Sequence, residues 1–99
     1  MDHRGRLTGF CISGHAGLAE SGQDVLCAFV SSAAYMAANT ITEIIGAQAQ
    51  AQADDGNMIV SVDQKDIGKC QTVLAGLRLH LLQTEEQYPK NLKVIITEV

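Results

Sequence analysis

The hydrophobic pattern of the first half of the chain changes its period near residue 24. Residues 7–13 alternate bulky with small or polar side chains, and this period of two predicts a β-strand. From Asp24 to Ile45 apolar residues recur at helical spacing, which predicts a helix of about six turns. Asp24 is a favoured N-cap residue and Gly46 is a favoured stop. We therefore expect a strand, a loop and then the central core helix.

The second half begins with an ambiguous segment, the strict alternation AQAQAQA at residues 47–53. Alanine and glutamine are good helix formers, so propensity alone would extend the preceding helix. A helix here would have no apolar stripe, and the DDG at residues 54–56 is a turn signal. We therefore expect a strand that forms a hairpin with a second strand at residues 58–62.

The last two predicted elements are a helix over residues 65–88, which stops before Pro89, and a strand over residues 92–99. The full order is strand, helix, hairpin, helix and strand. This order is typical of an α+β fold in which two helices pack on one small sheet. A chain of 99 residues has room for one hydrophobic core, so we expect a single domain over residues 1–99.

Composition and charge exclude several classes of function. An apolar fraction of 46% is that of an ordinary globular protein. The net charge is −4 and the 7 basic residues are scattered, so no direct nucleic-acid partner is expected. Charged residues make up 18% of the chain, below the usual value of about a quarter, which suggests that a second subunit covers part of the surface.

Targeting signals and cofactor motifs are not found either. No apolar run approaches the roughly 18 residues that cross a bilayer, and the N-terminus does not resemble a secretion signal. We therefore expect a cytoplasmic protein with no membrane partner. The 3 cysteines include no CxxC pair, which argues against a disulfide framework and a structural zinc site. The glycines match no phosphate-binding motif, so we expect no metal and no cofactor.

Residues 13–32 bring a histidine and a cysteine close together in the sequence. His15 follows the predicted strand, and Cys27 takes the third position of the predicted helix when Asp24 is the cap. Unpaired N–H groups at a helix start favour a thiolate and can donate to an oxyanion. An imidazole can accept the thiol proton and return it to a leaving group. This arrangement is suited to a cysteine nucleophile with a histidine base.

Three features accompany this pair. The negative charge of Asp24 opposes a thiolate, so a structural or substrate-positioning role suits it better than an activating one. Ser31 lies four residues after Cys27 and can orient the imidazole or bond the helix backbone. The loop over residues 14–22 has few bulky anchors and is expected to move as a flap. Its small residues include Gly14, Ala16, Gly17 and Gly22.

A packing role is open for the same residue types. A buried cysteine in a small domain is most often a small hydrophobe, so the residues alone leave Cys27 either catalytic or structural. Cys70 lies on the apolar face of the second helix and Cys11 lies in a strand, and we expect a structural role for both. His80 lies among leucines and His3 in a polar tail, and a packing or surface role suits each.

The segments SGHAG at residues 13–17 and SGQDVLCAFVS at residues 21–31 resemble the ribosomal-processing cysteine protease (Prp) family. Members carry Gly-His-Ala, a glycine-rich loop, and a helix start with Asp, two apolar residues, Cys-Ala and a later Ser. The resemblance covers nearly the whole chain. It departs at the start, because members begin with an extra strand before the turn that corresponds to residues 3–6. The first strand of the family pattern is therefore expected to be missing here, either because it is absent or because the sequence is truncated, and this bears on sheet completeness and dimerisation.

The resemblance implies a bacterial endopeptidase. Its substrate would be the N-terminal extension of a large-subunit ribosomal protein, number twenty-seven, removed before ribosome assembly. By the same resemblance Cys27 is the nucleophile and His15 its base, with Gly14, Asp24 and Ser31 at the other motif positions. The loop would move to admit the peptide, and the chain would form a homodimer.

Two other functions stay open. A non-enzymatic, ribosome-associated module could bind the peptide without cleaving it. A cysteine hydrolase could act on a small molecule, although an open loop offers little enclosure for one.

Overall fold

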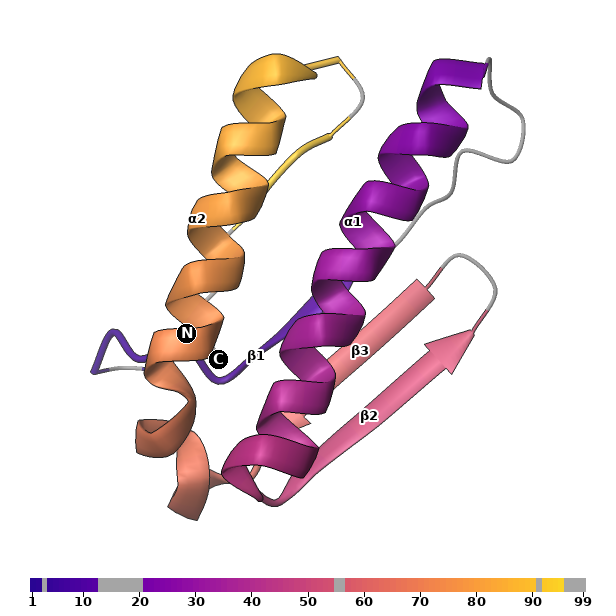
Figure 1. The fold of residues 1–99 in the computed structure, drawn as a ribbon. Helices are drawn as coiled ribbons and strands as arrows, with labels where there is room; N and C mark the ends of the chain where they lie inside the picture. Colours follow the sequence, from indigo (N-terminus) through magenta and orange to yellow (C-terminus); the bar gives the residue numbers. More distant parts are fainter. Residues whose placement is uncertain (3, 13–20, 55–56, 91, 96–99) are drawn as a thin grey trace.

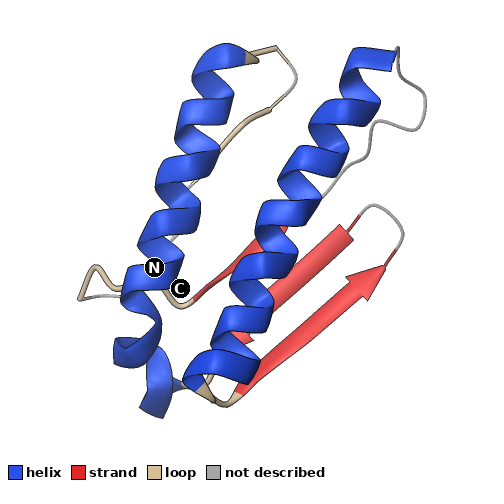
Figure 2. Cartoon of the chain, viewed as in Figure 1, coloured by secondary structure: helices blue, strands red, loops and turns tan. Residues whose placement is uncertain are grey.

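Two helices lie side by side over one face of a three-stranded sheet (Figures 1 and 2). The computed structural model describes all residues except 3, 13–20, 55–56, 91 and 96–99, and it leaves the side chains of residues 21–25, 27 and 54 undescribed as well. The predicted α+β class is confirmed. The elements in chain order are β1 (Gly9–Ile12), α1 (Ser21–Asn39), η1 (Thr40–Ile45), β2 (Ala49–Asp54), β3 (Asn57–Val62), η2 (Gln64–Cys70) and α2 (Gln71–Gln87).

The sheet is antiparallel throughout, with the strand order β1-β3-β2. The alternating segment pairs with β3 from Ala49↔Val62 to Asp54↔Asn57, which confirms the predicted hairpin. On its other side β3 pairs with β1, in a register that begins at Gly9↔Ser61. Among the residues that the structure describes, β3 is thus the central strand and β1 and β2 lie on either side of it.

The core lies between the sheet and the helices. In β3 the exposed fractions of Met58, Val60 and Val62 are 7%, 1% and 5%, while the alternate residues face solvent. This is the period of two that a half-buried strand requires. Ala34 and Ala38 of α1 are buried in the same cluster, and their small side chains let the helix approach the sheet closely. The sheet therefore has one packed face and one open face.

The first helix begins earlier than expected. It starts at Ser21, so Asp24 is its fourth residue rather than its cap, and Gly22 lies in the helix rather than in the loop. Serine and glycine are tolerated at a helix start, where the first four N–H groups have no intrahelical partner in any case. A carboxylate in the first turn also interacts favourably with the helix dipole.

The end of this helix agrees with the prediction. The α-helical turns pass at Thr40 into the π-helical η1, which stops at Gly46 with a left-handed φ of 73°. The hydroxyls of Thr40 and Thr42 donate to the carbonyl oxygens of Met36 and Ala38, at 2.7 and 3.2 Å. Such back-bonding perturbs regular helix geometry and accounts for the change of pitch at this point.

The second predicted helix consists of two parts, the 3₁₀-helical η2 and the α-helical α2. At their junction the side chain of Gln71 reaches back to the segment before β1. Its Nε2 donates to the carbonyl oxygen of Leu7 at 2.6 Å, and its Oε1 accepts from the N–H of Leu7 at 2.9 Å. The amide therefore holds the start of β1 against α2.

Asp66 makes a second link, between η2 and the start of the hairpin. Its Oδ2 accepts from the backbone N–H of Gln48 at 2.8 Å, and its Oδ1 lies 3.3 Å from the Nζ of Lys69. The Gln48 N–H holds the pKa of this carboxyl below its usual value, and Lys69 acts in the same direction. The charged form of Asp66 therefore joins these two parts of the fold.

The predicted last strand is wrong for residues 92–95, which have no regular secondary structure. The N–H of Leu92 donates to the carbonyl oxygen of Tyr88 at 3.0 Å, and the N–H of Val94 donates to Oε2 of Glu85 at 3.0 Å. A strand needs a neighbouring strand for these groups, and here Glu85 of α2 and Tyr88, directly after α2, supply the partners instead. Residues 96–99 lie outside the described part of the chain.

Gly9 and Gly76 provide a matched test of the β1–β3 contact. A Cβ atom at Gly9 would collide with the carbonyl oxygen of Val60, whereas a Cβ at Gly76 within α2 meets nothing within 4 Å. We expect Gly9→Ala to lower the free energy of unfolding by about 2 kcal/mol, because a backbone atom must move. Gly76→Ala should raise it by about 0.5–1 kcal/mol through helix propensity. Urea unfolding measures both, and equal effects would contradict this account of β1.

Candidate active site

Much of the predicted site lies outside the described residues. His15, Gly14, Ala16 and Gly17 belong to residues 13–20, which the structure does not describe. Cys27 lies in α1, where its backbone is described and its side chain is not. The pairing of His15 with Cys27 therefore stays a prediction from the sequence.

The structure changes the expected environment of Cys27. It is the seventh residue of α1, in the second turn, and not the third residue as predicted. At 1.5 Å per residue its backbone lies about 9 Å along the axis from the start of the helix. The unpaired N–H groups belong to the first four residues of a helix. The predicted position of Cys27 in the first turn is therefore wrong, and stabilisation of its thiolate or of an oxyanion by the helix start stays a prediction without that position to support it.

The spacing within α1 still groups three motif positions. Asp24, Cys27 and Ser31 follow one another at intervals of three and four residues within the helix. Residues at these intervals lie on one helix face. Ser31 is half-buried, and between the motif positions Val30 is buried and packs towards the core. The roles of Asp24 and Ser31 stay predictions.

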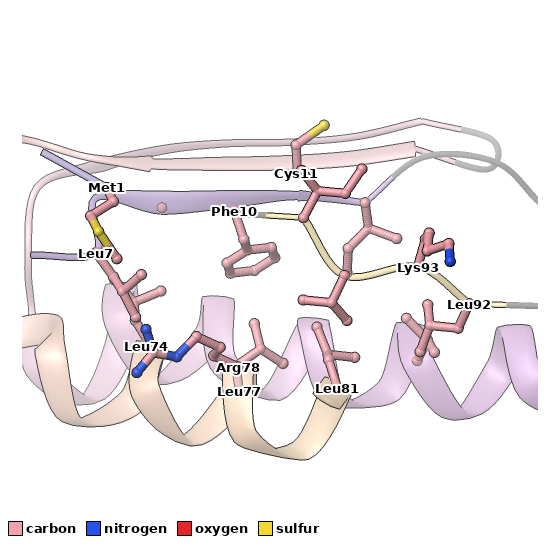
Figure 3. A pocket seen from close by; sticks show the side chains of 15 residues that line it. Met1, Leu7, Phe10, Cys11, Leu74, Leu77, Arg78, Leu81, Leu92 and Lys93 are labelled. Carbon is pink, nitrogen blue, oxygen red and sulfur yellow. The ribbon is translucent and has the colours of Figure 1, made fainter. Parts of the chain in front are cut away.

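The other cysteines have distinct environments. Cys70 has an exposed fraction of 0% and belongs to the core, which confirms its packing role. Burial raises the pKa of the Cys70 thiol, and the negative charge of Asp66 raises it further, so the neutral thiol is favoured. Cys11 is exposed, and its sulfur points away from the helices (Figure 3).

His80 joins the two helices. Its ring stacks on that of Phe29, with centroids 4.9 Å apart and planes inclined by 25°. This contact between α1 and α2 gives His80 a packing role, one of the two roles expected for it. His3 lies outside the described residues.

The structure also contains a pocket that the sequence patterns did not predict. This β1–α2 pocket has a volume of about 420 Å³ and lies between β1, α2 and residues 92–95, with Met1 and Leu7 from the segment before β1 and one residue from α1. In Figure 3 Phe10 of β1 points towards the helix, and Leu77 and Leu81 of α2 lie below it. Its walls come from segments that are far apart in the chain, so no local pattern could reveal it.

The pocket adjoins both chain segments of the predicted site. Ile12, which lines it, is the last residue of β1 and directly precedes the SGHAG motif. Val30, which also lines it, follows Cys27 by three residues in α1. Arg78 and Lys93 contribute two cationic side chains, and no carboxylate is among the described lining residues. An apolar pocket with positive charge thus lies beside the segments that carry the motifs.

Two further findings concern only the described part of the chain. No group of three or more histidine, cysteine, aspartate or glutamate side chains there could hold a metal ion. No helix among those residues is both long and apolar enough to cross a membrane.

Comparison with solved structures confirms the fold. The protein SMU.848 from Streptococcus mutans superimposes with a TM-score of 0.84 at 24% identity, over 99% of this chain and 92% of that one. The essential ribosomal processing protease Prp from S. aureus, solved with a substrate peptide, gives a TM-score of 0.83 at 22% identity, over 99% and 96% of the two chains.

Comparison of sequences gives the family. The family described as cysteine protease Prp matches residues 1–93. The ribosomal processing cysteine protease Prp of Bacillus subtilis (strain 168) is 30% identical over 98 residues, which cover 93% of this chain and 88% of the relative. This chain therefore belongs to the cysteine protease Prp family, and the predicted enzyme class, a hydrolase that acts as a cysteine protease, is confirmed.

Proposed function

We propose that this protein is an endopeptidase that removes the N-terminal extension of a bacterial large-subunit ribosomal protein, number twenty-seven. In this proposal Cys27 is the nucleophile and His15 is its base. The observation that carries the proposal is the motif pair, residues 14–16 and 24–31, within a chain whose family match extends over residues 1–93.

The proposed reaction has two steps. In the first, His15 takes the proton of the Cys27 thiol, and the thiolate attacks the scissile carbonyl carbon to form a tetrahedral intermediate. The C–N bond then breaks, the imidazolium protonates the leaving amine, and the N-terminal extension remains as a thioester on Cys27. In the second step His15 takes a proton from water, the resulting hydroxide attacks the thioester, and the extension leaves as a carboxylic acid while the thiol is restored.

The arrangement of β1 and α1 supports this pairing. His15 follows Ile12 by three residues, and Cys27 precedes Val30 by three residues. Ile12 and Val30 line the same pocket, so the end of β1 lies close to the second and third turns of α1. Three residues span about 10 Å when extended, so a chain that leaves β1 at Ile12 is long enough for His15 to reach α1 near Val30.

The proposed setting is the cytoplasm, where ribosomes assemble, with the chain acting as a homodimer. Exposed apolar side chains on α1 and η1 support the binding of a second subunit to this surface of the helices. Phe29, Tyr35, Met36 and Ile44 have exposed fractions of 49%, 51%, 58% and 80%. A net charge of −4 fits a protease that binds the peptide extension rather than ribosomal RNA.

Substitution of the two motif residues tests the chemistry. Cys27→Ala should abolish cleavage of the ribosomal precursor, because no other thiol is proposed to attack. His15→Ala should lower kcat by about 10²–10⁴-fold, the usual contribution of a general acid–base group. Mass spectrometry of the products measures both effects. Cys70→Ala is the matched control, because it removes a buried thiol from the core and should leave cleavage intact. Unchanged cleavage by Cys27→Ala would refute the proposed nucleophile.

Thiol alkylation tests the activation of Cys27 separately. With iodoacetamide, Cys27 should react fastest, because an adjacent base raises the thiolate fraction. Cys11 is exposed but has no described ionic partner, so it should react more slowly, and the buried Cys70 should react slowest. Peptide mapping over time measures the three rates, and the urea-unfolded chain, in which they should become similar, is the control. If folded Cys27 reacts no faster than Cys11, the non-enzymatic peptide-binding alternative is favoured.

A further inference from the structure

Tyr35 lies in the same row of α1 as the motif positions Cys27 and Ser31. The three residues follow one another at intervals of four within the helix. At about 100° per residue, each step of four turns the position by about 40°, and Asp24 falls within the same sector. Residues at such intervals are neighbours on one helix face. Tyr35 therefore continues the face that carries the proposed nucleophile.

The side chains of this row become more exposed towards Tyr35. Ser31 is half-buried, whereas Tyr35 has an exposed fraction of 51%. Long side chains of a helix point back towards its N-terminal end and cover the preceding turn. We therefore expect the ring of Tyr35 over the turn that contains Ser31, on the side of Cys27. A large aromatic surface is thus available to a molecule that binds at Cys27.

The distance between Tyr35 and Cys27 suits a peptide substrate. Tyr35 follows Cys27 by eight residues, which corresponds to about 12 Å along the helix axis. A ring that reaches back by one turn, about 5.4 Å, lies about 7 Å from Cys27 along the axis. An extended peptide rises about 3.3 Å per residue. A peptide along this face therefore meets the ring about two to four residues from the scissile bond.

This part of the helix carries no charge. The sequence has no acidic or basic residue between Asp24 and Glu43. A charged peptide side chain would lose hydration against the ring without an ionic partner from α1. An aliphatic or aromatic side chain gains free energy from burial there. The surface around Tyr35 therefore favours an apolar side chain of the substrate.

The position of Tyr35 differs from that of the other exposed apolar side chains of α1. Met36 has an exposed fraction of 58% but lies about 100° further around the helix. Its sulfur lies 3.6 Å from Oγ1 of Thr40, one turn further towards the C-terminal end. Phe29 lies on the same side of α1 as Met36, two turns away, and stacks on His80 of α2. Phe29 and Met36 thus lie towards α2, whereas Tyr35 lies on the motif side.

We propose that Tyr35 determines specificity: its ring packs against an aliphatic or aromatic side chain of the substrate peptide, about two to four residues from the scissile bond. The inference rests on the proposed function for the nucleophile and for the identity of the peptide. A contact so far from the scissile bond stabilises the bound substrate and the transition state equally. Tyr35 therefore acts on KM and on the choice of peptide, and not on kcat.

Three variants test the contact through cleavage of a fluorogenic decapeptide that spans the junction of the ribosomal precursor. Tyr35→Ala should raise KM about tenfold with little change in kcat, because packing against the ring is lost. Tyr35→Phe keeps the ring and should keep KM within about twofold of the wild-type value. Met36→Ala is the matched control, because it truncates an exposed neighbour on the other side of the helix and should leave KM unchanged. Equal effects of Tyr35→Ala and Met36→Ala would overturn the inference.

A double-mutant cycle identifies the peptide side chain in contact. Decapeptides with single alanine substitutions are cleaved by the wild-type protein and by Tyr35→Ala. One substitution, about two to four residues from the scissile bond, should raise KM about tenfold for the wild type and have little further effect in Tyr35→Ala, because both changes remove the same contact. Additive effects at every peptide position would contradict a direct contact.

The oligomeric state separates a substrate contact from a subunit contact. Tyr35 is also one of the exposed apolar side chains that support a second subunit. Sedimentation velocity of Tyr35→Ala, at the concentration of the cleavage assay, should give the same species as the wild type, and urea unfolding verifies that the variant folds. A smaller species that accompanies the rise in KM would overturn the inference and assign Tyr35 to the subunit interface.

The outcomes distinguish this inference from the proposed function. Cleavage of the precursor without coupling between Tyr35 and any peptide position overturns the inference and keeps the protease. If the precursor is not cleaved, the same cycle is measured as binding of fluorescein-labelled decapeptides by anisotropy. Coupling in that assay keeps the contact and overturns the protease, whereas absence of coupling overturns the inference as well.

Discussion

The double hydrogen bond between the Gln71 amide and the backbone of Leu7 determines where β1 begins. The amide lies at the start of α2 and bonds both the N–H and the carbonyl oxygen of Leu7. Two residues later Gly9 comes so close to the carbonyl of Val60 that no side chain fits. Together these contacts fix a strand of only four residues between the sheet and the second helix. The pocket beside β1, and the exit of the chain towards the SGHAG motif, both depend on that position.

The position of β1 also bears on the proposed protease site. The end of β1 leads into the segment that carries His15, and one face of α1 carries the motif positions Asp24, Cys27 and Ser31 at intervals of three and four residues. Small alanines pack α1 into the core, and the Phe29–His80 stack joins it to α2. In the proposed mechanism the thiol of Cys27, in the second turn of α1, is activated by His15 rather than by the helix start. This is the main change that the structure makes to the chemistry expected from the sequence.

Local patterns predicted the elements whose partners are near in the sequence. The hairpin was predictable because the alternation and the turn signal agree. The end of the first helix was predictable because its last position has a left-handed φ of 73°, which favours glycine. The helix begins four residues earlier than predicted, because the preference of aspartate for the cap position is weak and did not fix the start at Asp24. Residues 92–95 keep the alternation of a strand, with Leu92 and Val94 half-buried and Lys93 and Ile95 exposed, but a strand requires a neighbour that no local pattern can guarantee. The pocket depends on contacts between distant segments, and the catalytic assignment came from the motif pair rather than from periodicity.

The central claim is that a peptide bond is cleaved through a thioester on Cys27. The most direct measurement is intact-protein mass spectrometry after rapid mixing with the ribosomal precursor and acid quench, followed by peptide mapping. We predict a transient mass increase equal to the acyl form of the N-terminal extension, located on the peptide that contains Cys27 and absent from Cys27→Ala. Cleavage of the precursor by Cys27→Ala, or an adduct located on Cys11 or Cys70, would contradict the account.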